Sequence, residues 1–168
     1  VGKQEFAGYW EYVLDEAMFT APSHPNWGGT ALIGERGDLL GIGSLQLEAS
    51  GGKDLNMVVP IDLLKPVIDE LLTYGGRKGP VRPWLGWYVA DAEQKLVVMG
   101  LANRGPAERA KIESGDLVLA VNGEPPDGLA DLFRKIWAMG DAGVEVPLTL
   151  ERDSRTVEVT VKSGDRNA

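Results

Sequence analysis

The chain has 168 residues, of which 43% are apolar, and carries a formal net charge of -8 with one histidine and no cysteine. Its Lys and Arg residues are scattered along the sequence and do not form the basic cluster that is typical of proteins that bind nucleic acid or an anionic membrane. Without cysteine, and with His24 alone, disulfides, thiolate catalysis and multi-histidine metal centres are excluded, so we expect no metal and no cofactor.

Three further observations concern the whole chain. No apolar run approaches the roughly 20 residues that span a bilayer, so we expect no membrane insertion. The sequence starts at Val1 without an initiator methionine or a signal-like segment, which predicts a fragment of a longer protein. A change in composition near residue 75 favours two domains.

Residues 1–75 alternate strand signals with turn signals. Short runs of apolar and aromatic residues predict strands over Phe6 to Leu14, Thr30 to Gly34, Leu39 to Leu47 and Leu55 to Val59. Gly37 predicts a hairpin turn between the second and third of these strands, because glycine supplies the positive φ that tight turns require.

Over residues 62–74 the apolar residues recur at the spacing of a helix, which predicts a helix there. Asp62 is the predicted N-cap, Pro66 is tolerated in the first turn, and Gly75 is the predicted stop. The segment 76–83 is rich in glycine, proline and cations and predicts a linker. Solvated charge explains those cations better than a docking patch for an acidic partner.

Residues 84–164 predict a second domain of mixed strands and helices. The predicted elements are a strand that opens at Trp84, a strand over Leu96 to Leu101, a short helix beginning at Pro106, a helix over Leu129 to Met139, and strands over Val144 to Arg152 and Thr156 to Val161. Asn122 and Gly123 predict a turn. The fold class expected for the whole chain is mainly β with helices (α+β).

One sequence motif in this second domain is specific for a domain family. Its segments are Gly105-Pro106-Ala107-Glu108-Arg109-Ala110, Gly115-Asp116 and Val121-Asn122-Gly123. The run resembles the signature of PDZ domains in bacterial proteases, and the similarity covers nearly all of residues 84–164. The connection Asp91 to Lys95 is shorter than in many relatives. The resemblance implies a peptide-binding domain.

A PDZ domain binds a peptide as an extra strand on a sheet edge, here beside Trp87 to Ala90. The resemblance implies that the N–H groups of Leu85, Gly86 and Trp87 receive a terminal carboxylate. The residues expected to bind peptide are Trp84, Leu85, Gly86, Trp87, Tyr88, Val89, Leu129, Leu132, Phe133 and Ile136. Because the helix does not start with histidine, we expect apolar C-termini to be preferred. The alternative for the two tryptophans and for most of the helix face is ordinary core packing.

The first domain carries a second resemblance. Asn26-Trp27-Gly28-Gly29-Thr30-Ala31-Leu32, the turn at Gly37 and the passage Met57-Val58-Val59-Pro60-Ile61-Asp62-Leu63-Leu64-Lys65 are similar to the end of the protease domain in trypsin-like serine proteases of the HtrA/Deg family. The resemblance implies the C-terminal half of a double β-barrel over residues 1–75, with the catalytic His and Asp in a half that would lie upstream of Val1.

Trp27 stands where this family carries its serine nucleophile. An indole has no O–H to give a general base and cannot form an acyl-enzyme, so covalent acyl transfer at this position is excluded. The stretch from Asp15 to Trp27 is also longer than in the family. We interpret Trp27 as an aromatic plug over the vacated cleft in preference to a ligand-stacking residue. Ser23 and His24 are interpreted as residues of a surface loop and not as a catalytic pair.

Three functions follow as hypotheses. The favoured one is a peptide-binding module of a proteolytically inactive HtrA relative, whose partners are peptides or unfolded proteins and not nucleic acid. The second is a fragment of an active serine endopeptidase of protein quality control. The third is a structural segment of a homo-oligomer, because a half-barrel leaves strand edges that seek a partner. The resemblance implies the bacterial periplasm or cell envelope.

Overall fold

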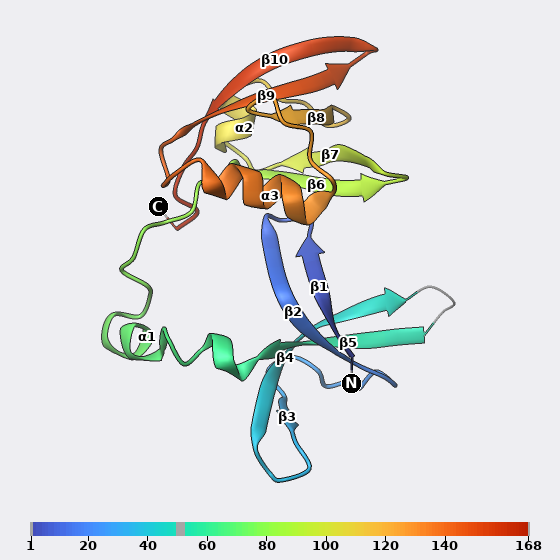
Figure 1. The fold of residues 1–168 in the computed structure, drawn as a ribbon, viewed down its shortest axis with the longest axis vertical. Helices are drawn as coiled ribbons and strands as arrows, with labels where there is room; N and C mark the ends of the chain where they lie inside the picture. The colour runs from blue at the N-terminus through green and yellow to red at the C-terminus, as the bar shows by residue number, and fades with distance from the viewer. Residues whose placement is uncertain (1, 50–52, 168) are drawn as a thin grey trace. The chain divides into compact units, whose positions relative to one another are not determined.

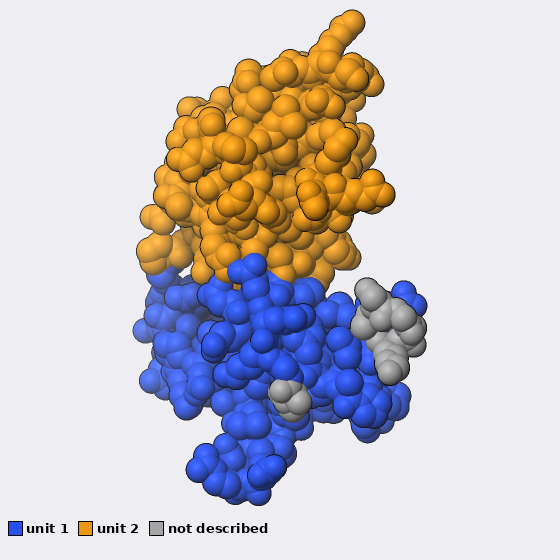
Figure 2. Space-filling model, turned by 45° about the vertical axis from the view of Figure 1, so that its right-hand side comes forward, with its two compact units in different colours: residues 1–6, 14–79 blue, residues 7–13, 80–168 orange. Residues whose placement is uncertain are grey.

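The structure, a computed structural model, describes residues 2–49 and 53–167 and divides the chain into two compact units (Figure 2). Unit 1 comprises residues 1–6 and 14–79, and unit 2 comprises residues 7–13 and 80–168. Each sheet has five strands in antiparallel pairing, and the helices are few. The expected fold class, mainly β with helices, is therefore confirmed.

The sheet of unit 1 has the strand order β1-β2-β5-β4-β3 (Figure 1). Its strands are β1 (Gly2–Gly8), β2 (Tyr12–Thr20), β3 (Ala31–Ile33), β4 (Leu39–Ala49) and β5 (Lys53–Pro60). Three of the four predicted strands are confirmed. The continuous strand predicted over Phe6 to Leu14 is wrong, because the chain turns at residues 9–11, where Glu11 has a φ of 60° that no strand residue adopts.

The prediction of a single helix over residues 62–74 is also wrong, because the segment forms two separate helical elements. A 3₁₀ turn, η1 (Ile61–Leu63), is followed by α1 (Ile68–Tyr74). Pro66 lies between them, where it removes a backbone donor and disfavours the helical conformation of the residue before it. Asp62 caps neither helix and accepts a hydrogen bond from Lys65 Nζ at 2.6 Å. Gly75, with a φ of 70°, ends α1 as predicted.

Unit 2 is built on the sheet β10-β9-β8-β7-β6, which leaves β6 at one edge (Figure 1). Its elements are β6 (Trp87–Ala92), β7 (Lys95–Leu101), α2 (Pro106–Arg109), β8 (Leu117–Val121), α3 (Leu129–Ala138), β9 (Glu145–Arg152) and β10 (Arg155–Lys162). The predicted strands and helices are confirmed, with Pro106 at the start of α2, except that the strand predicted to open at Trp84 begins at Trp87, because Gly86 adopts a positive φ before it. One continuous core joins the sheet to α3 through residues such as Leu85, Trp87, Phe133 and Leu148.

A buried ion pair fixes the loop before β8. Asp116 is 1% exposed and accepts two hydrogen bonds from Arg152, from Nε and Nη2, each at 2.7 Å. Arg152 Nη1 also contacts the exposed carboxylate of Glu113 at 2.6 Å. Burial acts to raise the pKa of Asp116, but the hydrogen bonds from Arg152 and from the Glu113 backbone outweigh it and lower that pKa.

We predict that Asp116→Asn lowers the free energy of unfolding by about 3 kcal/mol, because it leaves the guanidinium of Arg152 facing a neutral partner in a buried site. Glu113→Gln is the matched control, and its effect is expected to stay below about 1 kcal/mol, because this carboxylate is solvated. Urea unfolding followed by circular dichroism measures both. Equal effects of the two substitutions would contradict the assignment.

Candidate peptide-binding site

The loop that precedes β6 presents main-chain donors in one direction. Trp84 exchanges two backbone hydrogen bonds with Gly164, of 3.0 and 2.9 Å, which fix the start of the loop. Gly86 then adopts a φ of 72°, and a Cβ atom there would lie 3.1 Å from Pro106 Cδ and 3.2 Å from the Trp84 ring. Only glycine fits this position without strain, so Gly86 allows the three successive N–H groups of the loop to converge.

A carboxylate lies where these N–H groups converge. Glu11, which is 7% exposed, accepts hydrogen bonds from Leu85 N at 3.1 Å to both oxygens, from Gly86 N at 2.8 Å, and from Trp87 N at 3.5 Å. Leu85, Gly86 and Trp87 are the three residues from which sequence resemblance implied carboxylate binding. The geometry of the loop therefore suits an anion with two oxygens.

The residues around Glu11 lie along β6. The N–H of Val89 donates to the carbonyl of Tyr9 at 2.9 Å, and the Tyr9 ring meets the ring of Tyr88 edge-on with centroids 6.0 Å apart. Val13 packs against the core of unit 2. This segment, residues 7–13, was not identified as part of the site from the sequence. Its only signal there is an acidic residue between the aromatic residues 9, 10 and 12.

The remaining predicted site residues are mostly part of the core. Leu132, Phe133 and Ile136 of α3 are fully buried, while Leu129 is partly buried against the core. Trp87 is 1% exposed, and its Nε1 has no hydrogen-bond partner among the described residues. Val89 is buried, Trp84 is half-buried and Tyr88 is 38% exposed. Core packing, the alternative given for these side chains, therefore describes most of them, and their contact with a peptide stays a prediction.

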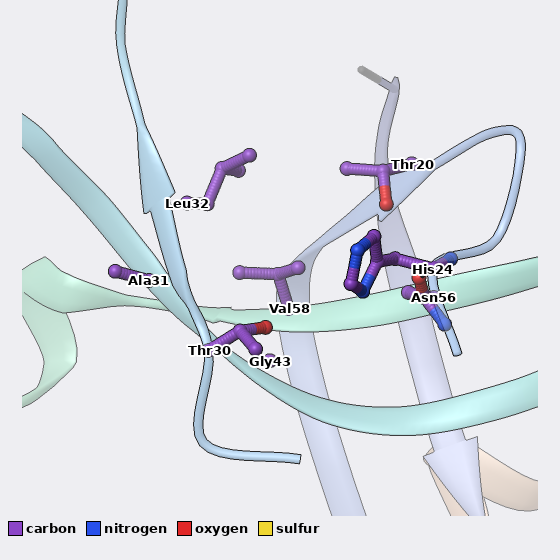
Figure 3. A pocket seen from close by; sticks show the side chains of 8 residues that line it. All are labelled: Thr20, His24, Thr30, Ala31, Leu32, Gly43, Asn56 and Val58. Carbon is purple, nitrogen blue, oxygen red and sulfur yellow. Dashed lines mark hydrogen bonds between the residues drawn. The ribbon is translucent and has the colours of Figure 1, made fainter. Parts of the chain in front are cut away.

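Unit 1 contains a separate open pocket of about 250 Å³ (Figure 3). The described residues that line it are Thr20, His24, Thr30, Ala31, Leu32, Gly43, Asn56 and Val58, without Trp27. The Trp27 carbonyl accepts a hydrogen bond from Thr30 Oγ1 at 2.9 Å. It also lies so near β4 that a Cβ at Gly43 would come within 2.0 Å of it. The plug interpretation of Trp27 stays a prediction.

His24 makes local contacts. Its Nδ1 accepts a hydrogen bond from Asn26 N at 3.1 Å, and its own backbone N–H donates to Asn56 Oδ1 at 2.5 Å. Within the described residues, no hydrogen bond joins Ser23 to His24. The Nδ2 of Asn56 is buried without a partner among the same residues. This arrangement fits a surface loop and does not form a catalytic pair.

Burial raises the pKa of Glu11 to about 7 from its ordinary 4.5, although the three backbone hydrogen bonds and the charge of Arg166 act to lower it. The buried carboxyl group therefore binds a proton more tightly than an exposed one does. Its linked contribution to stability is fully present below pH 4.5 and is lost as the pH rises through 7.

We predict that the carboxyl ¹³C resonance of Glu11 titrates with a midpoint near pH 7, and that the free energy of unfolding falls between pH 4.5 and about pH 7 because of this group. Glu11→Gln is the control, in which that part of the pH dependence disappears. A Glu11 midpoint below pH 5 would contradict the burial of its carboxyl group.

Comparisons with known proteins identify a matching domain family and similar proteins. Residues 83–163 match the family described as PDZ domain. A probable periplasmic serine protease of the do/HhoA-like type from Haemophilus influenzae is 29% identical over 164 residues, 92% of this chain and 34% of that protein. A probable periplasmic DegP-like serine endoprotease from Pseudomonas fluorescens is 30% identical over 155 residues, 83% of this chain and 32% of that protein. The chain thus spans about a third of the length of these curated relatives.

Solved structures agree on the fold. The HtrA-type protease AlgW, solved with a decapeptide, has a TM-score of 0.56 and 23% identity over 90% of this chain and 50% of its own. A serine endoprotease from Yersinia pestis has a TM-score of 0.50 and 24% identity over 80% of this chain and 46% of its own. None of the helices in the described part of the chain has the length and apolarity needed to cross a bilayer. Residues 83–163 thus match the PDZ domain family, the chain is similar over most of its length to DegP-like and do/HhoA-like serine proteases, and it shares the fold of HtrA-type proteases.

Proposed function

We propose that unit 2 captures the free C-terminus of an extended apolar peptide. The observation that carries this proposal is the convergence of the N–H groups of Leu85, Gly86 and Trp87 on one carboxylate, at the start of an edge strand. A peptide that pairs with β6 would have its backbone hydrogen bonds satisfied and its terminal carboxylate at this loop. The decapeptide in the AlgW structure supports a peptide ligand for this fold.

The chemistry of unit 1 supports a binding protein over a protease. At Trp27, the position that the sequence resemblance assigns to the family's serine, the side chain has no oxygen to attack a carbonyl group. His24, which lines the nearby pocket, uses its Nδ1 for a contact within its own loop. We therefore propose that the chain binds peptides or unfolded proteins without hydrolysing them. The relatives named above are periplasmic, which supports the same compartment for this protein.

The exposed apolar residues of α1 favour a second function, self-association of the chain. α1 buries none of its residues, and Leu72 and Tyr74 are 80% and 57% exposed. Such an apolar surface is typical of a contact face. Sedimentation velocity tests it, with loss of a concentration-dependent dimer expected in Leu72→Glu. A wild-type chain that stays monomeric at high concentration would contradict self-association.

The peptide-binding proposal is tested by calorimetric titration with an N-acetylated decapeptide of apolar residues that ends in valine, prepared with a free and with an amidated C-terminus. We predict binding on the order of micromolar Kd for the free form and at least about tenfold weaker binding for the amide, because the amide cannot offer two anionic oxygens.

Gly86→Ala should weaken binding of the free form at least about tenfold, because the new Cβ displaces the loop at a positive φ. Gly123→Ala is the matched control, since Gly123 has a φ of 79° with open space around it and lies outside the loop. Equal affinity for the free and amidated peptides, or equal effects of the two substitutions, would contradict C-terminal capture.

A further inference from the structure

We propose that residues 7–13 are a built-in ligand of the peptide groove, which a peptide C-terminus must displace in order to bind. This inference rests on the proposed function, because it assigns the groove to peptide termini. The segment belongs to unit 2, together with residues 80–168 (Figure 2). Its contacts with β6 and the loop repeat those that an added peptide strand would make.

The direction of the segment is that of an antiparallel strand beside β6. Tyr9 bonds to Val89 through its carbonyl, and two residues later Glu11 reaches the loop at Leu85 to Trp87. The segment therefore runs toward the loop while β6 runs away from it. In this arrangement the Glu11 side chain provides the carboxylate that a peptide would provide at its last residue.

Other contacts hold the segment in the groove. Arg166 Nη1 donates to the carbonyl of Trp10 at 3.2 Å, the Tyr9 ring packs edge-on against Tyr88, and Val13 contacts the core. Glu11 itself has a φ of 60°, a conformation that costs energy for a residue with a long side chain. The contacts of Glu11 with the loop help to offset this cost.

Occupation by Glu11 and by a peptide terminus is mutually exclusive. Each N–H of Leu85, Gly86 and Trp87 already donates to the Glu11 carboxyl group, so a peptide carboxylate can take the same donors only after the Glu11 side chain has left. The apparent affinity for peptide is thus reduced by the fraction of molecules in which residues 7–13 have left the groove.

The test compares four forms of the whole chain: wild type, Glu11→Ala, Glu11→Gln and Glu16→Ala. Glu16 is an exposed glutamate on β2 that forms an ion pair with Lys3, and it serves as the matched control. Each form is titrated calorimetrically with the free-carboxylate decapeptide and with its amide, after circular dichroism has shown that it is folded. Glu11→Gln keeps the shape of the side chain and provides a folded variant if Glu11→Ala does not fold.

We expect Glu11→Ala to bind the free peptide at least about tenfold more tightly than wild type, Glu11→Gln to show a smaller gain, and Glu16→Ala to show none. Equal, carboxylate-dependent affinity in wild type and in both Glu11 variants would overturn the built-in ligand and leave C-terminal capture standing. Failure of every form to bind, including Glu11→Ala with its vacated loop, would overturn the proposed function and the built-in ligand with it.

Discussion

The three main-chain N–H groups of Leu85, Gly86 and Trp87 converge on one point and require hydrogen-bond acceptors there, and this requirement organises the loop before β6. The loop can hold this shape only because Gly86 adopts a positive φ against Pro106 and Trp84. Unsatisfied, the three buried donors would each cost about 1–3 kcal/mol. A carboxylate offsets that cost for all three, whether it comes from a side chain or from a peptide terminus.

The rest of unit 2 keeps this loop rigid. The sheet ends at β6, whose outer edge is contacted by residues 7–13. Leu132, Phe133 and Ile136 of α3 pack in the core of the same unit. At the other side of the sheet, the ion pair of Asp116 and Arg152 ties the turn before β8 to β9. Under the proposed function, backbone groups of the loop and of β6 would supply most of the affinity for a peptide, while side-chain pockets would set its specificity.

The sequence predicted the architecture well where local signals are strong. Gly86 and the Gly105–Ala110 run predicted a PDZ loop and helix start, and the strands of unit 2 followed from apolar runs between turns. It failed at Phe6 to Leu14, where aromatic residues hide a turn that contains neither Asn nor Pro, and at Pro66, which separates two helical segments. The role of Glu11 was not predictable, because its partner Leu85 is 74 residues away and local patterns carry no information about such pairings.

Hydrogen exchange of individual backbone amides tests the competition for the loop most directly. We predict that the amides of Leu85, Gly86 and Trp87 are protected without peptide and stay protected when a free-carboxylate peptide saturates the chain, because one carboxylate replaces another. The Val89 amide should behave in the same way, while the carboxyl ¹³C resonance of Glu11 should move to that of an exposed glutamate only in the presence of the peptide. An unchanged Glu11 resonance at saturation would show that peptide binds elsewhere and would contradict a shared site.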